Sequence, residues 1–215
     1  MNREQLSQKI IDTCLEMTRL GLNQGTAGNV SVRYKDGMLI TPTGIAYEKL
    51  TSDHIVYVDN QGHHEEGKLP SSEWGFHLVV YQKRASADAV IHNHALNCAA
   101  VSIFEKPIPA IHYMIAVSGT NHIPCTPYAT FGSKKLVEYV GKGIMESKAI
   151  LLSHHGCVVA EANLDKALWL AHEVETLASW YMKLLATGQK IPLLPDDEME
   201  IVLEKFKNYG LKIEE

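Results

Sequence analysis

The chain has 215 residues, of which 46% are hydrophobic and 21% are charged, and its formal net charge at pH 7 is −5. This composition is typical of a globular protein, and the negative charge argues against a nucleic-acid or anionic-membrane partner, which usually shows a basic face. No apolar run reaches the ~18 residues that span a bilayer, and the first residues hold no apolar signal core. The four cysteines form no Cys-x-x-Cys pair, which predicts reduced thiols and a cytoplasmic location.

Hydrophobic periodicity predicts helices and strands in mixed order along the chain. The predicted helices are 4–20, 70–84, 95–104, 133–145, 163–187 and 196–208. The predicted strands are 30–34, 38–41, 54–58, 89–94, 149–152 and 157–160. A serine before Glu73 is expected to cap the second helix, because its hydroxyl can accept from first-turn amides. Residues 107–131 are expected to be irregular, with short extended pieces.

This order of elements predicts the fold class. Strands come both as hairpins and singly, with helices between them, and strict alternation of strand and helix is absent. We therefore expect an α/β protein, a three-layer sandwich with a largely antiparallel central sheet flanked by helices, rather than a doubly wound parallel sheet. The sequence has no internal repeat or linker-like stretch, so residues 1–215 are predicted to form a single domain.

Two histidines close the buried strand predicted over 89–94. His92 and His94 are two positions apart, so on a strand both side chains point to the same side. Two imidazoles side by side on a rigid element suit a divalent metal ion. The alternative is a histidine pair that caps or lines a polar core, and this pair alone does not decide between them.

A second pair, His154 and His155, follows the strand predicted over 149–152. Adjacent strand residues face opposite sides, so at most one of the two can join His92 and His94. Three imidazoles from two strand ends would make a zinc-type site with an open position, as in catalytic zinc centres. The alternative is a polar strand end near the surface.

Glu73 is the candidate carboxylate, because a helix start can direct a charged group into a cleft. The alternative is an ordinary first-turn glutamate that stabilises the helix dipole by ~0.3–1 kcal/mol. His77 lies one turn further on the same helix face, where we interpret it as a packing or supporting residue rather than a ligand.

Three stretches offer neutral donors for an anion: 25–29, Thr43-Gly44 and Ser71-Ser72. Successive amides in turns and at helix starts form concave anion sites. None of the three contains Lys or Arg, so a phosphate here would be held by neutral donors and by a nearby metal ion. The alternative is that each stretch is an ordinary turn.

Taken together and in this order, these motifs resemble the class II aldolase/adducin-head family. The motifs are Gly-Thr-Ala-Gly-Asn-Val-Ser at 25–31, Thr-Pro-Thr-Gly at 41–44, Pro-Ser-Ser-Glu at 70–73, His-Asn-His at 92–94 and His-His-Gly at 154–156. The similarity extends over essentially the whole chain, including its tail at 206–211.

The resemblance implies a role for each matching residue. The ligands of one zinc ion per subunit would be His92, His94 and His155, with Glu73 as a fourth ligand at rest and the catalytic acid/base during turnover. The phosphate would be bound by Gly28, Asn29, Thr43, Gly44, Ser71 and Ser72. The aldehyde half of the substrate would be served by Tyr113 and Tyr209, with Phe131 shaping its pocket. The family forms cyclic homotetramers with active sites at subunit interfaces, so the last three residues can face a neighbour's zinc.

The resemblance also implies the reaction. It points to reversible retro-aldol cleavage of L-fuculose 1-phosphate to dihydroxyacetone phosphate and L-lactaldehyde, through a metal-stabilised enediolate with Glu73 as acid/base. One alternative is an L-ribulose-5-phosphate 4-epimerase-type or other sugar-phosphate activity; those epimerases tend to carry Asp at the position of Glu73. The other is a non-catalytic adducin-head-like structural module, which has no need of the metal ligands.

Overall fold

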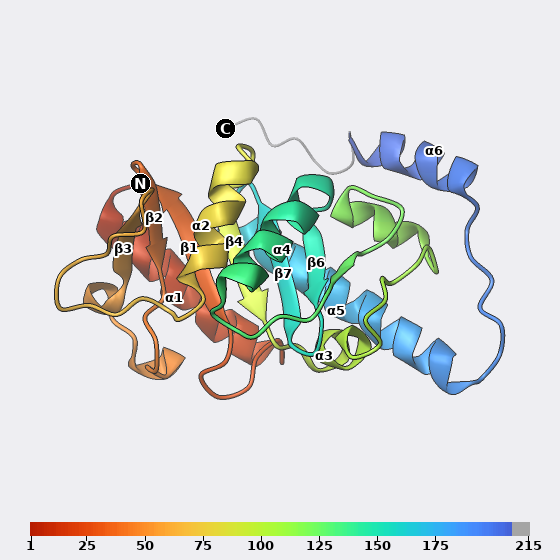
Figure 1. Ribbon diagram of the computed structural model, residues 1–215, viewed down its shortest axis with the longest axis horizontal. Helices are drawn as coiled ribbons and strands as arrows, with labels where there is room; N and C mark the ends of the chain where they lie inside the picture. The colour runs from red at the N-terminus through yellow and green to blue at the C-terminus, as the bar shows by residue number, and fades with distance from the viewer. Residues whose placement is uncertain (208–215) are drawn as a thin grey trace.

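The computed structural model describes residues 1–207, in which a single sheet forms the middle layer (Figure 1). Its strands are β1 (Asn29–Tyr34), β2 (Gly37–Ile40), β3 (Val56–Asp59), β4 (Ala89–Asn93), β5 (Cys125–Thr126), β6 (Ala149–Leu152) and β7 (Gly156–Glu161). They lie in the order β3-β2-β1-β4-β7-β6-β5, and all neighbours are antiparallel except β5 and β6. The prediction of a largely antiparallel central sheet is confirmed.

Helices cover both faces of this sheet. They are α1 (Arg3–Arg19), α2 (Trp74–Lys83), α3 (Leu96–Ser102), α4 (Lys134–Glu146), α5 (Leu164–Ala186) and α6 (Asp196–Phe206). One hydrophobic core lies between the sheet and α2 and α4, and a second lies between the opposite face and α1, α3 and α5. Figure 1 shows α2 and α4 in front of the sheet, with α1 and α5 behind it. The predicted three-layer sandwich is therefore confirmed.

The alternation of side chains along β4 decides which layer receives its histidine. Val90 packs in the core below α2 and α4, whereas Ile91 packs in the core on the other face. His92 therefore points to the α2 side, as a residue two positions after Val90 must. There its ring meets Phe76 of α2 edge-on, with the ring centroids 5.3 Å apart.

The predicted start of α2 needs a correction. The helix begins at Trp74, and the N-cap position is held by Glu73, whose side chain makes no capping hydrogen bond. The serine hydroxyl of Ser71 accepts from the Glu73 amide at 3.3 Å, two residues on. Residues 71–74 instead form a turn in which the Trp74 amide donates to the Ser71 carbonyl at 3.0 Å. The Ser71 amide donates to the carbonyl of Thr41 at 3.0 Å, which holds this turn beside the end of β2.

Two further boundaries differ from the sequence prediction. β3 begins at Val56, because Ser52–His54 forms a 3-10 turn instead of the start of the strand. α3 ends at Ser102, and at Glu105 the backbone has turned to a φ of 53°. Residues 107–131 are irregular as predicted, apart from the 3-10 helix η3 (Tyr113–Ser118) and the two residues of β5.

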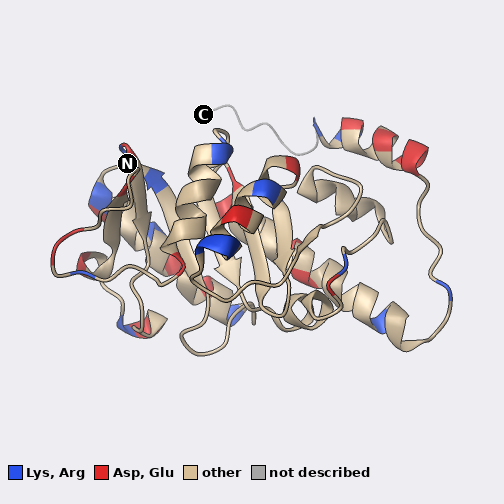
Figure 2. Cartoon of the chain, in the orientation of Figure 1, with Lys and Arg blue, Asp and Glu red and all other residues tan. Residues whose placement is uncertain are grey.

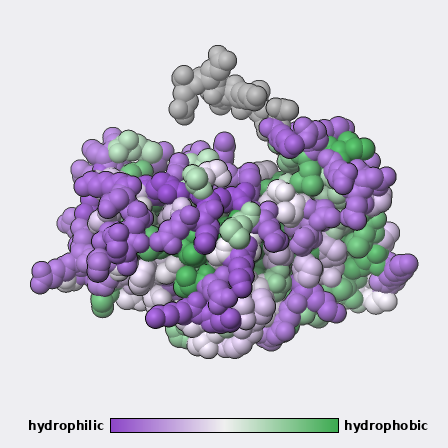
Figure 3. Space-filling view, turned by 45° about the horizontal axis from the view of Figure 1, so that its top comes forward, coloured by the Kyte–Doolittle hydropathy of each residue, from purple (hydrophilic) through white to green (hydrophobic). Residues whose placement is uncertain are grey.

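The surface carries charges of both signs. Figure 2 shows basic and acidic residues on most elements, with acidic residues along α6. The face in Figure 3 is mostly hydrophilic, with separate hydrophobic areas. Among residues 1–207, none of the helices combines the length and the apolar character needed to cross a membrane.

Candidate metal centre

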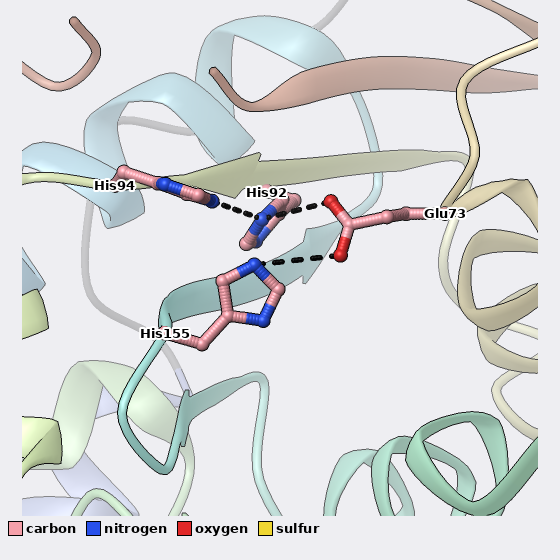
Figure 4. Close-up of side chains that lie close together, drawn as sticks. All are labelled: Glu73, His92, His94 and His155. Carbon is pink, nitrogen blue, oxygen red and sulfur yellow. Dashed lines mark hydrogen bonds and ion pairs between the residues drawn. The ribbon is translucent and has the colours of Figure 1, made fainter. Parts of the chain in front are cut away.

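Three imidazoles converge at one end of the sheet, on the side covered by α2. His92 lies in β4, and His94 follows directly after it. His155 lies in the turn between β6 and β7. Each pair of these rings has centroids 4.7 Å apart, and the Nε2 atoms of His92 and His94 are separated by 2.8 Å. Figure 4 shows the three rings turned toward one another.

Only one member of the second histidine pair takes part, as expected, but both lie in a turn and not on a strand, so the backbone of the turn separates them. His154 adopts a φ of 54° and turns away, so that its Nε2 lies 3.0 Å from a carboxylate oxygen of Glu105. His155 is held by its backbone amide, which donates to the carbonyl of Leu152 at 3.0 Å and to the hydroxyl of Ser102 at 3.3 Å. The tight turn between β6 and β7 therefore presents a single imidazole to the group.

Glu73 completes the group from the start of α2. Its Oε2 lies 3.2 Å from Nε2 of His92, and its Oε1 lies 3.4 Å from Nε2 of His155 (Figure 4). Asn29 of β1, directly opposite His92 in the sheet, donates from Nδ2 to Oε2 at 3.1 Å. One ligand atom from each of Glu73, His92, His94 and His155 can be chosen so that all four lie within 4.8 Å of one another.

The electrostatics of the group suit a cation. Burial lowers the pKa of His94 to about 3 and that of His155 to about 4, with a further contribution from His92. Burial on its own would raise the pKa of Glu73, but His92, His155 and the Asn29 amide outweigh it and hold that pKa below its usual range. At neutral pH the group therefore offers a carboxylate and at least two uncharged imidazoles.

Two observations test whether these residues fit a metal ion. Oε1 of Glu73 is buried and makes no hydrogen bond to any residue that the structure describes, which is costly unless another partner satisfies it. Nδ1 of His92 lies 2.9 Å from the carbonyl oxygen of Cys157, so this nitrogen carries the proton and leaves Nε2 free to bind. Three imidazoles and one carboxylate form a donor set that divalent transition metals accept. The residues fit a divalent metal ion.

The group opens into a cavity of about 340 Å³ that also receives the three predicted anion-binding stretches. The predicted phosphate residues that line it are Gly28, Asn29, Thr43, Gly44, Ser71 and Ser72, and Phe131 lines it as well. The end of β2 and the segment before α2 are brought together by a bridge between Pro42 and Pro70. The described residues that line this cavity include no Lys and no Arg.

Other residues named from the sequence lie elsewhere. Tyr113, at the start of η3, is 48% exposed, and it lines a separate cavity beside α6. Tyr209 lies outside the described residues. His77 is fully buried behind Glu73 and is not a member of the metal-binding group.

Asn23 is a supporting residue that the sequence reasoning missed. Its Oδ1 accepts from the backbone amide of His94 at 3.1 Å, and its Nδ2 donates to the hydroxyl of Tyr47 at 3.2 Å. That hydroxyl in turn donates to the carbonyl of Ala27 at 3.0 Å. Asn23 therefore ties the loop around Ala27 to the end of β4. Its position after a helix-ending glycine suggests only a turn, and nothing local in the sequence signals its long-range contacts.

Comparison with known proteins adds to this geometry. Residues 8–182 match the family model described as Class II Aldolase and Adducin N-terminal domain. L-fuculose phosphate aldolase of Haemophilus influenzae is 71% identical over 215 residues, covering all of both chains. A 5-methylthioribulose-1-phosphate/5-deoxyribulose-1-phosphate aldolase of Escherichia coli is 58% identical over 212 residues, covering 99% of this chain and 100% of that protein.

Solved structures show the same fold. A structure of L-fuculose 1-phosphate aldolase is 38% identical, covers 96% of this chain and 98% of that chain, and superposes with a TM-score of 0.91. The family model matches residues 8–182, a range that contains all four candidate ligands. The chain therefore belongs to the class II aldolase and adducin N-terminal domain family.

Proposed function

We propose that this chain is a zinc-dependent aldolase that reversibly cleaves L-fuculose 1-phosphate to dihydroxyacetone phosphate and L-lactaldehyde. The observation that carries this proposal is the group of Glu73, His92, His94 and His155 at the wall of a cavity rich in neutral anion donors. It is supported by full-length identity of 71% to a relative named L-fuculose phosphate aldolase.

The phosphate of the substrate is bound by the neutral donors of the cavity. Thr43, Ser71 and Ser72 supply hydroxyl groups, and Gly28 and Gly44 supply backbone that a ligand can approach closely. Both glycines have a positive φ, of 79° and 71°, which other residues rarely adopt. A dianion held by amides and hydroxyls is bound by hydrogen bonds directed at its oxygens, which fixes the orientation of the sugar.

The metal-binding group supplies the electrophilic part of the site. A zinc ion held by His92, His94, His155 and Glu73 would act as a Lewis acid and stabilise the negative charge that develops on the substrate oxygens. Glu73 would hold the ion at rest and, once the substrate takes its place, would act as the acid/base.

Glu73 acts on the carbon next to the carbonyl group. Cleavage breaks the C3–C4 bond, C4 becomes the aldehyde carbon as its hydroxyl loses a proton, and the electron pair of the broken bond moves toward the C2 oxygen. The Glu73 carboxylate takes up the proton that the C4 hydroxyl released, directly or through a tyrosine phenol, and delivers it to C3; in the synthetic direction the carboxylate removes the proton from C3. Among residues 1–207, Oε1 has no hydrogen-bond partner, so it is the oxygen that can carry this proton.

The binding site for the aldehyde half of the substrate is completed by residues from a neighbouring subunit of a homotetramer. Tyr113 lies outside the cavity of its own chain, and a phenol can exchange a proton with the aldehyde oxygen. Tyr209 shares this task in the proposal, and Phe131 shapes the pocket. Large exposed aromatic side chains support an interface; they include Tyr113, Tyr128, Phe131, Trp169 and Trp180. Sedimentation velocity checks the tetramer.

The cysteines bear on where in the cell the enzyme works. The four cysteines are free thiols, which fits a reducing compartment, and we propose the cytoplasm. Two expectations stay predictions: the chain forms one domain, because its sequence has no internal repeat or linker-like stretch, and it has no nucleic-acid partner, because its net charge is −5.

The experiment that tests the substrate offers several sugar phosphates to the zinc-loaded protein in parallel. They are L-fuculose 1-phosphate, L-rhamnulose 1-phosphate, 5-deoxyribulose 1-phosphate and L-ribulose 5-phosphate. We expect release of triose phosphate with the highest kcat/KM on the first. A preference for 5-deoxyribulose 1-phosphate would keep the aldolase chemistry but move the substrate to that of the 58% identical relative. Formation of a pentulose epimer alone would refute the aldolase proposal.

A further inference from the structure

A row of buried polar side chains runs from Glu73 away from the cavity, between α2 and β1. Glu73, at the N-cap of α2, is followed at four-residue spacing by His77 and Tyr81 of the helix, and Asn29 and Ser31 are two residues apart on β1. Four helical residues rise about 6 Å and two strand residues about 6.6 Å, so the two sets stay in step. Hydrogen bonds can therefore alternate between the helix and the strand.

The hydrogen bonds form one unbroken chain. Asn29 Nδ2 lies 3.1 Å from Glu73 Oε2, and Asn29 Oδ1 lies 2.5 Å from His77 Nε2. On the other side of the imidazole, Nδ1 lies 2.7 Å from the Ser31 hydroxyl, which lies 2.7 Å from the hydroxyl of Tyr81. All five residues are buried, with exposed fractions between 0 and 7%. Water therefore cannot easily replace any of these partners.

The charge of Glu73 determines the direction of every bond in the row. A carboxylate only accepts, so Asn29 must turn its Nδ2 toward Glu73 and its Oδ1 toward His77. His77 must then carry its proton on Nε2, which leaves Nδ1 to accept from the Ser31 hydroxyl. The Ser31 oxygen in turn accepts from the Tyr81 hydroxyl. The opposite direction would place two acceptors, Oδ1 of Asn29 and the carboxylate, against each other.

We propose that His77 is a positioning residue for Glu73: its Nε2–H holds the Asn29 amide in the one orientation that donates to the carboxylate. This role rests on the proposed function, in which Glu73 transfers the proton at C3. Without the His77 donor, Oδ1 of Asn29 loses its buried partner, and the amide can rotate or withdraw. Glu73 then loses the bond that holds Oε2, and its Oε1 no longer has a defined place toward the substrate carbon.

The row also explains why the carboxylate lies at the helix start without capping it. Oε2 is directed to Asn29 and His92, and not to the first-turn amides of α2. Ser31 lies one hydrogen bond beyond His77, and Tyr81 lies two hydrogen bonds beyond it. The effect of removing a link should therefore fall with its distance from Glu73, in the order His77, Ser31, Tyr81.

The test compares His77→Leu with His77→Gln in the zinc-loaded full-length protein. Leu removes the donor to Asn29, whereas the Gln amide keeps one. Removing a group that orients a ligand or catalytic residue typically costs about 10- to 100-fold in activity. We expect His77→Leu to lose about tenfold or more in kcat, with KM within about threefold and zinc content unchanged, and His77→Gln to recover most of that loss.

Val80→Ala is the matched control. Val80 is fully buried on α2 beside the row but belongs to the apolar core and makes no hydrogen bond through its side chain. It should lower thermal stability while leaving kcat nearly unchanged. A fall in kcat that merely parallels the loss of stability in all three variants would overturn the positioning role, as would a His77→Leu enzyme with ordinary kcat.

A second readout does not depend on activity. Long-range ¹H–¹⁵N correlation spectra of the unaltered protein distinguish the two imidazole tautomers, and we expect His77 to show a proton on Nε2. A proton on Nδ1 would overturn the proposed direction of the row even if the enzyme is active. Conversely, an unaltered protein that cleaves no ketose 1-phosphate would refute the proposed function, and the tautomer would still decide the bond direction.

Discussion

Replacement of Gly28 by alanine tests how closely the anion-binding loop approaches the metal ligands. A Cβ at Gly28 would lie 2.5 and 2.6 Å from the side-chain amide of Asn23 and 2.7 Å from the carbonyl oxygen of His92. Gly25 offers a matched control, because its φ of 60° is also positive but an added Cβ meets nothing within 4 Å. The two variants share the backbone strain and differ in the steric contact.

The expected losses follow from these contacts. An alanine held at a positive φ destabilises the folded state by about 1–2 kcal/mol. Alanine also makes the unfolded chain less flexible than glycine does, which offsets about 0.4–1 kcal/mol of this loss. Gly25→Ala should therefore lower the free energy of unfolding by roughly 1 kcal/mol. Gly28→Ala adds an overpacking cost of about 1–3 kcal/mol, because neither the His92 carbonyl in β4 nor the hydrogen-bonded Asn23 amide can move freely. Its total loss should be about 2–4 kcal/mol.

The assay is urea unfolding at fixed protein and zinc concentrations, since a bound ion and subunit association both shift the midpoint. Zinc affinity is measured beside it, and we expect Gly28→Ala to weaken it because the clash pushes on the backbone that carries His92. Equal losses of stability in the Gly25 and Gly28 variants, with unchanged zinc affinity, would refute the close approach of this loop to β4.

Three further predictions concern the site and the pH dependence of stability. Glu73→Gln should keep zinc but lose about 10²–10⁴-fold in cleavage rate, whereas full activity with zinc bound would remove Glu73 from the mechanism. A chelator should abolish triose phosphate release and added zinc should restore it; turnover that survives complete zinc removal would contradict a metal-dependent reaction. Two hydrogen bonds from Arg3, at 2.5 and 2.7 Å, hold the pKa of Glu65 down to about 2 from its ordinary 4.5. Because this pKa is depressed in the folded state, the stabilisation is present above pH 4.5 and is lost as the pH falls toward 2. The difference in unfolding free energy between the unaltered protein and Glu65→Gln should therefore shrink over that window, and a constant difference would argue against the ion pair.

Local signals in the sequence were sufficient to place most secondary structure. Asn163 caps α5 through a bond from the amide of Lys166 at 2.9 Å, and Ser133 caps α4 in the same manner, as their side chains suggest. The predicted start of α2 was wrong because residues 71–74 form a turn before the helix, and the bond from the Ser71 amide to the Thr41 carbonyl, thirty residues away in sequence, holds this turn beside β2. Such a contact has no local signature.

The sequence also placed the candidate ligands on the correct elements. The two-residue spacing of His92 and His94 directs both side chains to one space, because strand alternation is a local rule. His154 and His155 are separated instead by the turn in which they lie, where His154 has a φ of 54°. These patterns alone left a polar core or a surface strand end as alternatives. The family motifs narrowed the choice, and the close grouping of Glu73 with three imidazoles agrees with them.

What the sequence by itself determined was the set of elements, their amphipathic faces and the chemistry that each one carries. Only the tertiary structure decided that β1 lies beside β4, so that Asn29 faces His92, and that α2 lies over β1, so that His77 reaches Asn29. The physical reason is that side-chain direction follows from local backbone geometry. The pairing of distant elements depends instead on which apolar faces are buried together, and many pairings satisfy the same local pattern.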